Sequence, residues 1–170
     1  MYHAKIFYAI GFLLLVVACG GRNFNPESTR VDVGGHKLNI RCSGEGSPAV
    51  ILGSGLASDN HDWRPVEERV SEFTQVCSYD RTGLGESESV EGEPTAQVAS
   101  DRLHSLLLAA GINRPVVMVG HSYSGLVALL YPTQHPENTA GLVLVDSLQK
   151  DNLISAAEIL GEQAMAVFMN

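Results

Sequence analysis

The sequence predicts an α/β fold, in which a mostly parallel sheet of about six strands lies between flanking helices. Short apolar segments rich in β-branched residues alternate with segments of helical periodicity along the chain. Several of the apolar segments run directly into loops rich in glycine and serine. A hairpin pattern around Gly34-Gly35 precedes this alternation. Together these patterns favour a sheet that is covered by helices on both faces.

The expected elements follow one another in a regular order. The predicted strands are residues 29–33, 36–42, 49–52, 74–79, 116–119 and 140–145. The predicted helices are residues 62–71, 95–110, 122–131 and 148–170. Gly111 ends the second helix, because glycine favours a helix C-terminus, and Pro132 is expected to end or kink the third, because proline interrupts a helix. Segments 116–119 and 140–145 contain no polar residue, which is typical of buried strands.

Length and charge limit the classes of function. The chain has 170 residues, which fits one domain, and 45% of them are hydrophobic, as in globular proteins. The 19 acidic and 11 basic residues give a formal net charge of −8, and no Lys/Arg cluster is present. Nucleic acid is therefore not an expected partner. The three cysteines lack the spacing of a metal site, so no metal is expected.

The N-terminus has the pattern of an export signal. Residues 6–17 form an uncharged apolar run, which is shorter than the ~20 residues of a membrane span and suits a signal peptide. The run ends in Val16-Val17-Ala18-Cys19-Gly20, which resembles the bacterial lipobox, where the cysteine is lipidated. A plain secretory signal or a short uncleaved anchor is the alternative interpretation.

The lipobox interpretation sets the domain boundaries and the location. We expect a lipoprotein signal peptide over residues 1–18, a polar tether over 19–28 and a folded domain over 29–170. Two lipid chains on Cys19 would anchor the protein stably in a membrane. Glycine after Cys19 resembles the pattern of outer-membrane lipoproteins, so we expect a protein that faces the periplasm or the cell exterior.

The strongest chemical signal is Ser122. An apolar segment runs into His121-Ser122-Tyr123-Ser124-Gly125, and a helical segment follows at once. A serine on a tight strand–turn–helix bend, with small residues two positions away on each side, is typical of a nucleophile elbow. These positions hold Gly120 and Ser124, so serine replaces the second glycine of the usual G-x-S-x-G motif. The following helix N-terminus and the Tyr123 N–H would favour negative charge beside Ser122.

Two other interpretations remain open at this point. Ser122 is also a favoured residue for capping a helix N-terminus without any chemistry. Separately, Gly53-Ser54-Gly55-Leu56-Ala57-Ser58 is close to the G-x-G-x-x-G fingerprint of dinucleotide-binding domains, and Asp80 ends the next strand. Ser58 replaces the third glycine of that fingerprint and a hairpin precedes it, and both facts argue against a dinucleotide site.

Several ordered segments resemble the α/β-hydrolase fold family, in its lipase-like and esterase-like branch. Residues 38–58 (LNIRCSGEGSPAVILGSGLAS) are similar to the family's second and third strands and its oxyanion loop. Residues 76–87 (VCSYDRTGLGES) are similar to its fourth-strand block, and residues 114–125 (RPVVMVGHSYSG) to its elbow. Residues 140–147 (AGLVLVDS) are similar to its sixth strand. The resemblance covers most of the chain and implies an α/β-hydrolase sheet.

The resemblance implies a reaction and an oxyanion hole. Ser122 would form an acyl-enzyme with a small-molecule ester or a related acyl substrate. The backbone N–H groups of Leu56 and Tyr123 would bind the oxyanion. Ser54-Gly55 stands where the family usually has His-Gly, which makes the assignment of Leu56 depend on this loop keeping its shape. No metal and no organic cofactor is implied.

The resemblance also implies roles for three charged residues. Asp146 ends the sixth strand, where some members of the fold place the catalytic acid, although aspartate also commonly caps such a strand–loop junction. Asp80 and Arg81 match the fourth-strand block, where we expect a structural charge pair.

The catalytic histidine is the missing member of the triad. It follows the acid in this fold, yet five of the six histidines precede Ser122, and His135, which comes before the sixth strand, is expected on the side away from the elbow. We therefore expect a C-terminally truncated hydrolase without the last two strands, inactive or weak because it lacks its base. The alternative is a non-catalytic, membrane-tethered binding module on the same fold.

Truncation has a structural consequence at the sixth strand. Residues 141–145 (GLVLV) would form a flat apolar edge, through which the chain is expected to associate with itself. Residues 148–170 resemble the start of the family's helical lid.

Within the resemblance, Cys42 and Cys77 lie on neighbouring strands of the sheet. In an oxidising periplasm we expect a disulfide between them. Two buried free thiols are the alternative.

Overall fold

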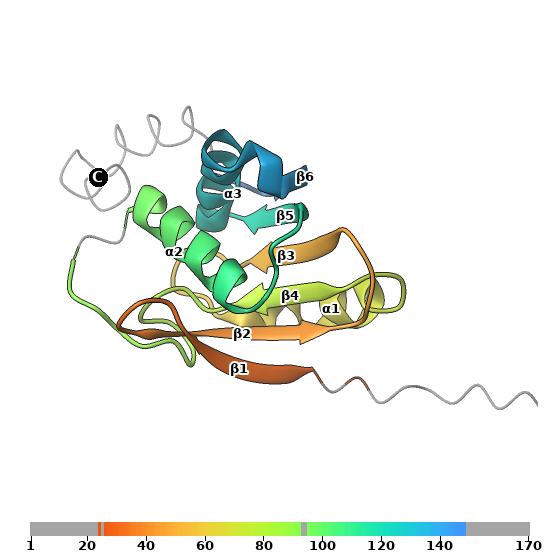
Figure 1. The fold of residues 1–170 in the computed structure, drawn as a ribbon, viewed down its shortest axis with the longest axis horizontal. Helices are drawn as coiled ribbons and strands as arrows, with labels where there is room; N and C mark the ends of the chain where they lie inside the picture. The colour runs from red at the N-terminus through yellow and green to blue at the C-terminus, as the bar shows by residue number, and fades with distance from the viewer. Residues whose placement is uncertain (1–23, 25, 93–94, 149–170) are drawn as a thin grey trace, which may run out of the picture.

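A six-stranded sheet forms the centre of the molecule (Figure 1). The computed structural model describes residues 24, 26–92 and 95–148. The strands are β1 (Glu27–Asp32), β2 (Lys37–Ser43), β3 (Ala49–Gly53), β4 (Val76–Tyr79), β5 (Val116–His121) and β6 (Thr139–Val145). The α-helices are α1 (Arg64–Val70), α2 (Ala96–Ala109) and α3 (Tyr123–Gln134). Two 3₁₀ turns, η1 (Asn60–Trp63) and η2 (Pro136–Asn138), precede α1 and β6.

The strand order is β1-β2-β4-β3-β5-β6, which confirms the predicted α/β class. β3 pairs in parallel with both β4 and β5, and β6 pairs in parallel with β5. The β1–β2 hairpin is antiparallel and joins β4 in antiparallel register. The carboxyl ends of β3, β4 and β5 therefore meet at one edge of the sheet, which is where open α/β sheets bind ligands.

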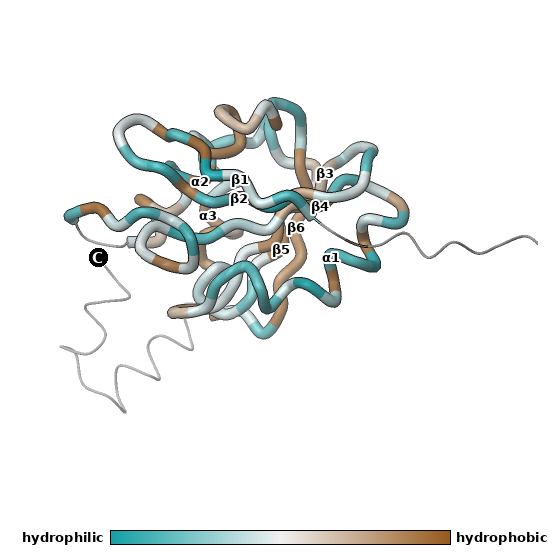
Figure 2. Tube along the Cα trace, turned by 90° about the horizontal axis from the view of Figure 1, so that it is seen from below, coloured by the Kyte–Doolittle hydropathy of each residue, from teal (hydrophilic) through white to brown (hydrophobic). Residues whose placement is uncertain are grey.

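Helices cover both faces of the sheet because side chains alternate along its strands. Ile51 and Met118 belong to the larger core cluster, together with buried side chains of α2 and α3. Leu52 and Val119, one residue further along each strand, belong to a second cluster with Trp63. Figure 1 shows α2 and α3 on one face and α1 on the other. In Figure 2, β5 and β6 are coloured largely as hydrophobic, whereas most of α1 is hydrophilic.

Several element boundaries differ from the sequence prediction, among them the start of β1 and the end of α3. β1 begins at Glu27, two residues early, because its first residues pair with β2. The last two residues of the expected tether therefore belong to the sheet. α3 continues past Pro132 to Gln134. The His135 N–H still donates to the Tyr131 carbonyl at 2.8 Å, so the proline does not end the helix.

The apolar sequence of β6 predicts a buried strand, and this prediction is wrong. The side chains from Leu142 to Val145 are 38% to 47% exposed. The reason is its place in the sheet, because β6 pairs only with β5 among the described residues. Its outer edge is the exposed apolar edge that the sequence also predicts.

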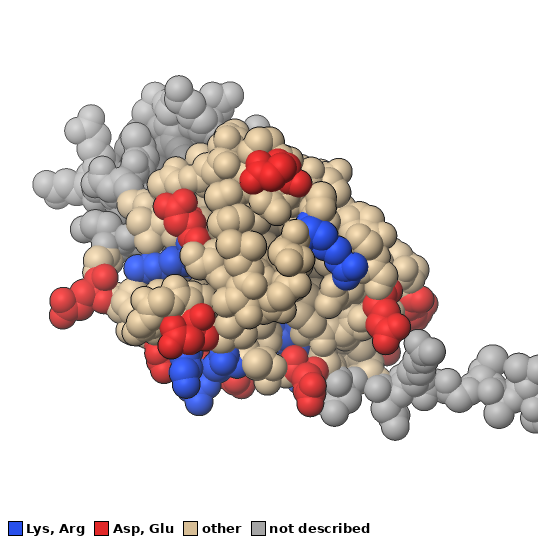
Figure 3. All heavy atoms as spheres, in the orientation of Figure 1, with Lys and Arg blue, Asp and Glu red and all other residues tan. Residues whose placement is uncertain are grey.

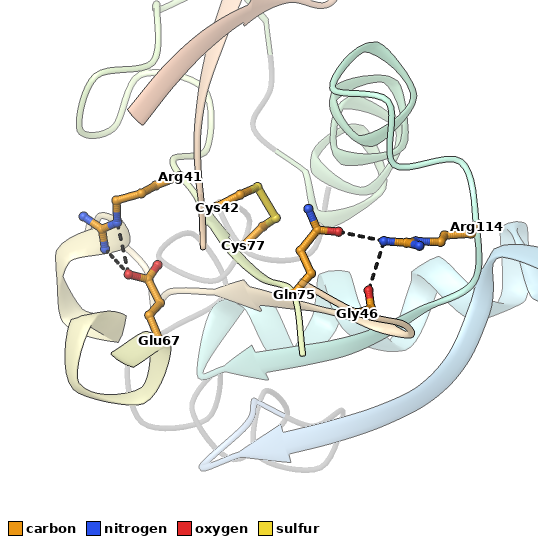
Figure 4. Close-up of a disulfide and its surroundings, with 7 residues drawn as sticks. All are labelled: Arg41, Cys42, Gly46, Glu67, Gln75, Cys77 and Arg114. Atoms are coloured by element: carbon orange, nitrogen blue, oxygen red, sulfur yellow. Dashed lines mark hydrogen bonds and ion pairs between the residues drawn. A yellow bond between two sulfur atoms is a disulfide. The ribbon is translucent and has the colours of Figure 1, made fainter. Parts of the chain in front are cut away.

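A disulfide joins β2 to β4 through Cys42 and Cys77 (Figure 4). The two residues are directly opposite in the antiparallel register, and their Cα atoms are 4.1 Å apart. This bond agrees with the sequence prediction. Next to it on β2, Arg41 forms a buried ion pair with Glu67 of α1 at 2.8 Å. The hairpin is therefore attached to the parallel strands covalently and to α1 by charge.

Several predictions fall outside the described residues. The signal peptide over residues 1–18 and the lipidation of Cys19 lie there, and so do residues 149–170 with the expected lid. In the part of the chain that is described, no helix combines the length and apolar content needed to cross a bilayer.

Candidate active site

Ser122 lies at a sharp bend between β5 and α3. Its backbone has φ 49° and ψ −118°, and a positive φ is uncommon for a residue other than glycine. Its N–H donates to the Val145 carbonyl at 3.2 Å, and its carbonyl accepts from the Leu148 N–H at 3.1 Å. The Ser122 side chain makes no capping hydrogen bond, so the structure does not support the interpretation of Ser122 as a helix cap. A strained serine without a structural use for its hydroxyl is a candidate nucleophile.

Small residues around Ser122 let the bend close. A Cβ on Gly120 would lie 2.3 Å from the Ser124 carbonyl oxygen, so no side chain fits at residue 120. Ser124 stands where glycine is usual, and it is accommodated because Gly53 of β3 lies opposite. A Cβ on Gly53 would come within 2.8 Å of the Ser124 Cβ. The departure from the motif at residue 124 is therefore matched by a glycine on the neighbouring strand.

Arg81 links the elbow to the loop that follows β3. Its guanidinium donates to Ser124 Oγ at 2.8 Å and to the backbone carbonyls of Ser54 and Gly55. Burial lowers the pKa of Arg81, which is only 9% exposed. The expected charge pair between Arg81 and Asp80 is absent, so that prediction is wrong. The reason is that Arg81 turns toward the β3 loop, whereas the Asp80 carboxylate binds other donors.

Asp80 holds together the loops behind the site. Its buried carboxylate accepts hydrogen bonds from the Asn39 side chain at 2.9 Å, the Asn60 N–H at 2.7 Å and the Glu86 N–H at 3.0 Å. These three donors satisfy a buried charge without a paired cation. A Cβ on Gly85 would come within 2.3 Å of Asp80 Oδ2, so the loop after β4 closes directly onto the carboxylate.

The turn after β3 lies against Ser122. A Cβ on Gly55 would lie 3.6 Å from the Ser122 Cβ and 3.2 Å from His121 Nδ1. The Ser58 N–H donates to the Gly55 carbonyl at 3.3 Å, and Leu56 stands within this turn with its side chain 46% exposed. The structure thus brings the turn that carries Leu56 next to the serine, although the two are 66 residues apart in sequence.

Tyr123 follows Ser122 and begins α3. Its buried ring lies under the Arg81 guanidinium, with 5.1 Å between Arg81 Cζ and the ring centroid. Burial raises the pKa of Tyr123, so the phenol stays protonated at neutral pH. The Tyr123 backbone N–H stands in the first turn of the helix, where the helix dipole favours a negative charge.

Asp146 follows β6 directly and stands beside the elbow. The carbonyl of the preceding residue, Val145, accepts a hydrogen bond from the Ser122 N–H. The next residue, Ser147, lies against α3, because a Cβ on Gly125 would overlap Ser147 Oγ at 1.6 Å. Asp146 itself is exposed, has φ 41° and has no hydrogen-bond partner within the described residues. The structure therefore brings the backbone of Asp146 close to Ser122 without giving its carboxylate a histidine.

No described histidine forms a hydrogen bond with Ser122. His121 faces Gly55 across the β3 turn. His104 of α2 and His135 after α3 stack on each other, with ring centroids 3.6 Å apart. Across residues 24, 26–92 and 95–148, no group of three or more His, Cys, Asp or Glu residues is arranged to hold a metal ion.

A cavity of about 260 Å³ adjoins the elbow. Leu56 and Tyr123 contribute to its wall, and further lining comes from α2 and from the loop after β4. Ligand pockets commonly enclose about 300–1,000 Å³, so this cavity suits a small ligand. Figure 3 shows that charged side chains are scattered over the face that carries α2 and α3, and most of this face is uncharged.

Comparison with known proteins assigns the family. A model described as the alpha/beta hydrolase family matches residues 50–168, which is more than half of the chain. The chain belongs to the alpha/beta hydrolase family. The sheet, the strained serine after β5 and the adjacent β3 turn of this alpha/beta hydrolase agree with that membership. The dinucleotide-binding interpretation of residues 53–58 is therefore discarded.

Relatives of this alpha/beta hydrolase are similar to it over part of their length. YqjL of Bacillus subtilis is 27% identical over 61% of this chain and 41% of YqjL. A candidate carbamate hydrolase, RutD of Escherichia coli, is 34% identical over 62% of this chain and 40% of RutD. The crystal structure of a candidate lipase, lip1 of Acinetobacter baumannii, is 30% identical, has a TM-score of 0.69 and covers 72% of this chain and 42% of lip1. The chain thus spans about two fifths of the length of these proteins.

Two features of the site were not predicted from the sequence. The contacts of Arg81 with the turn after β3 join segments that are far apart in the chain, and no local sequence pattern predicts them. The contact between Gly53 and Ser124 also joins distant segments. One signal for it was present, because the serine in place of the second motif glycine needs a small residue beside it.

Proposed function

We propose that this alpha/beta hydrolase cleaves an ester or a related acyl bond through an acyl-enzyme on Ser122. The observation that carries the proposal is the backbone of Ser122, which has a positive φ and forms hydrogen bonds with Val145 and Leu148, at and just after the end of β6. Storing strain at this half-buried serine has no structural purpose here, because the side chain does not cap α3. The similarity to a candidate lipase and a candidate carbamate hydrolase supports acyl chemistry.

The oxyanion hole of this proposal consists of the backbone N–H groups of Leu56 and Tyr123. The closeness of Gly55 to Ser122 supports this assignment, because it places the Leu56 turn beside the reacting hydroxyl. Arg81 supports it further by fixing the carbonyls of Ser54 and Gly55, which leaves the turn little freedom to move. Donors fixed in advance stabilise the tetrahedral intermediate without reorganisation.

The structure gives less support to a general base and a catalytic acid than to the nucleophile and the oxyanion hole of this proposal. No described histidine reaches Ser122, and Asp146 is the candidate acid because its backbone adjoins the elbow. We therefore expect slow acylation in this chain, since loss of one triad member removes most of the catalysis and leaves about 10³–10⁴ over the water reaction.

Fluorophosphonate labelling of the full chain tests the proposal. We expect covalent labelling that Ser122→Ala abolishes and that Ser89→Ala, at an exposed serine away from the elbow, leaves unchanged. Intact-mass measurement gives the stoichiometry and peptide mapping gives the position. Labelling at another serine, or equal labelling of the Ser122→Ala chain, would show that Ser122 is not a nucleophile.

A non-catalytic binding module is the second candidate function. It is favoured by the combination of a formed cavity and the lack of a histidine at Ser122 among the described residues. A folded chain that binds small acyl compounds but never reacts with a fluorophosphonate would support this candidate over the enzyme.

We also propose that the chain is exported and anchored through a lipid on Cys19, with its domain in the periplasm or outside the cell. The disulfide between Cys42 and Cys77 supports export, because such bonds persist mainly in oxidising compartments. Expression in a bacterial host with mass analysis of the membrane fraction tests this proposal. We expect a diacylated N-terminal peptide that Cys19→Ala removes, whereas a soluble, unmodified wild-type chain would overturn it.

A further inference from the structure

The cavity beside the elbow has a charge opposite to that of the whole chain. The chain has a formal net charge of −8, yet among the described residues the charged ones that line the cavity are Arg81 and Arg102, and none is acidic. The rest of the wall is mainly apolar, with Leu38, Val98 and Leu103 among its members. Such a cavity suits a ligand that is apolar along its length and negative at one point.

Arg102 is the cation that remains available to a ligand. Arg81 already donates to two backbone carbonyls and to Ser124. Arg102 of α2 is half-buried, and within the described residues it forms no hydrogen bond and no ion pair. A guanidinium presents paired N–H donors whose geometry matches a carboxylate.

Thr82 supplies a second polar group in the same wall. Its hydroxyl is buried and has no hydrogen-bond partner, and Thr82 lines the cavity. A buried hydroxyl without a partner costs free energy, which a ligand oxygen would relieve. A half-buried cation, Arg102, and a buried hydroxyl without a partner, Thr82, therefore border one apolar space.

One wall of the cavity joins the turn after β3 and the start of α3 to α2. Leu56 and Tyr123, whose N–H groups form the proposed oxyanion hole, line the cavity together with residues of α2. The α2 segment in the wall begins at its N-cap, Thr95, and includes Arg102. The helix segment from Thr95 to Arg102 is about 10 Å long, so a short aliphatic chain fits along this part of the wall.

We propose that the cavity binds the acyl chain of a substrate whose far end is a carboxylate, which pairs with Arg102. The substrate class is then the half-ester of a short aliphatic dicarboxylic acid. Hydrolysis would add one water across the ester bond and release an alcohol and the dicarboxylate. This inference rests on the proposed function for the direction of the substrate, because it places the ester carbonyl at Leu56 and Tyr123.

Ligand binding without turnover tests the inference. The full chain carrying Ser122→Ala is titrated with monomethyl adipate and with its neutral analogue, in which a carboxamide replaces the carboxylate, and backbone amide NMR signals follow binding. We expect the anion to bind about tenfold more tightly than the amide, as for a charge-assisted hydrogen bond. Shifts should concentrate at cavity residues such as Val98 and Leu103.

Variants at Arg102 decide whether this residue causes the preference for the anionic ligand. Arg102→Gln should remove the preference for the anion, and Arg102→Lys should restore part of it. Arg69→Gln is the matched control, because it removes an equal charge from an exposed position on α1, on the opposite face of the sheet. A preference that survives Arg102→Gln, or equal affinity for the two ligands, overturns the inference.

The test separates this inference from the proposed function. Anion binding that depends on Arg102, without fluorophosphonate labelling of Ser122, would reject the enzyme and keep the carboxylate site. Labelling of Ser122 without a preference for the anion would keep the enzyme and reject this substrate class.

Discussion

Arg81 donates a hydrogen bond to the side-chain oxygen of Ser124 at 2.8 Å, across 43 residues of sequence. The same hydroxyl donates in turn to the Ser54 carbonyl. The serine that departs from the usual elbow motif therefore links the bend at Ser122, the buried Arg81 and the turn after β3. Both serine contacts are buried, so neither is screened by water.

The first prediction concerns this link. Ser124→Ala should lower the free energy of unfolding by about 1–3 kcal/mol, because it leaves a guanidinium donor and a buried carbonyl with fewer partners. Ser105→Ala, which removes a hydroxyl–carbonyl hydrogen bond on the exposed side of α2, should change stability by no more than about 0.5 kcal/mol. Urea unfolding of both variants measures the difference, and equal effects would show that the network adds no stability.

The second prediction compares two glycines on adjacent strands. Gly120→Ala should prevent the elbow from closing, since its Cβ would lie 2.3 Å from a backbone oxygen. Gly141→Ala meets only the Val117 side chain at 3.6 Å, an ordinary contact. Neither glycine has a positive φ, so backbone preference does not separate them. We expect loss of folded protein, measured by thermal melting, for Gly120→Ala and near-normal melting for Gly141→Ala.

The third prediction concerns the disulfide. Replacing both Cys42 and Cys77 by serine should lower the free energy of unfolding by about 3–4 kcal/mol, from the entropy of the 35-residue loop that the bond closes. Reduction of the wild-type chain should have a similar effect in urea unfolding, and reductant should leave the double variant unchanged. A reduced chain as stable as the oxidised one would contradict the prediction.

The fourth prediction concerns pH and the stacked histidines. Burial and the neighbouring His135 lower the pKa of His104 below its usual 6.5, and Asp101 and Glu137 oppose this effect. The Tyr131 hydroxyl lies 3.1 Å from His104 Nδ1, and its pKa is raised to about 12, so it stays neutral. The unfolded chain therefore binds a proton more readily than the folded one, and stability should fall as pH drops below about 6.5.

A variant separates His104 from other titrating groups. His104→Gln keeps a polar partner for Tyr131 but does not titrate, so urea unfolding between pH 7.5 and 5 should show a weaker loss of stability than in wild type. Stability curves that run parallel over this range would exclude His104 as the source.

The fifth prediction concerns the outer edge of β6. Because four consecutive apolar side chains are about two fifths exposed and the edge has no described partner strand, the chain should associate with itself as concentration rises. Val143→Lys should reduce the association, since a charge on an edge strand opposes pairing. Sedimentation velocity measures this association, and Val66→Lys on α1 is the control at another exposed valine.

The sequence predicted the order and type of most elements because each carries a local signal. The elbow is the clearest case, since Gly120, Ser122 and the apolar run before them lie within one short segment. The disulfide was predicted because Cys42 and Cys77 lie on strands that are neighbours in the sheet of the family that the sequence resembles. The exposure of β6 conflicts with its apolar composition, because burial depends on which strands pair and not on a strand's own residues.

The contacts of charged residues were the least predictable part of the site. Asp80 and Arg81 are adjacent in sequence, which suggested a pair, but successive side chains leave a strand end in opposite directions. Each then finds partners from remote segments, Asn39 for one and Gly55 for the other. Arg102 has no hydrogen-bond or ion-pair partner among the described residues because of how the cavity packs, and the sequence around Arg102 does not predict this.

The direction of β1 has a consequence for any substrate reaching the protein from a membrane. β1 runs in the same direction as β4, so Glu27 stands at the end of the sheet opposite the elbow (Figure 1). Glu27 is eight residues after Cys19, and a segment of this length spans at most about 28 Å when fully extended. A lipid on Cys19 would thus attach the domain at the end of the sheet opposite Ser122, so that Ser122 would lie at the end of the domain farther from the attachment point.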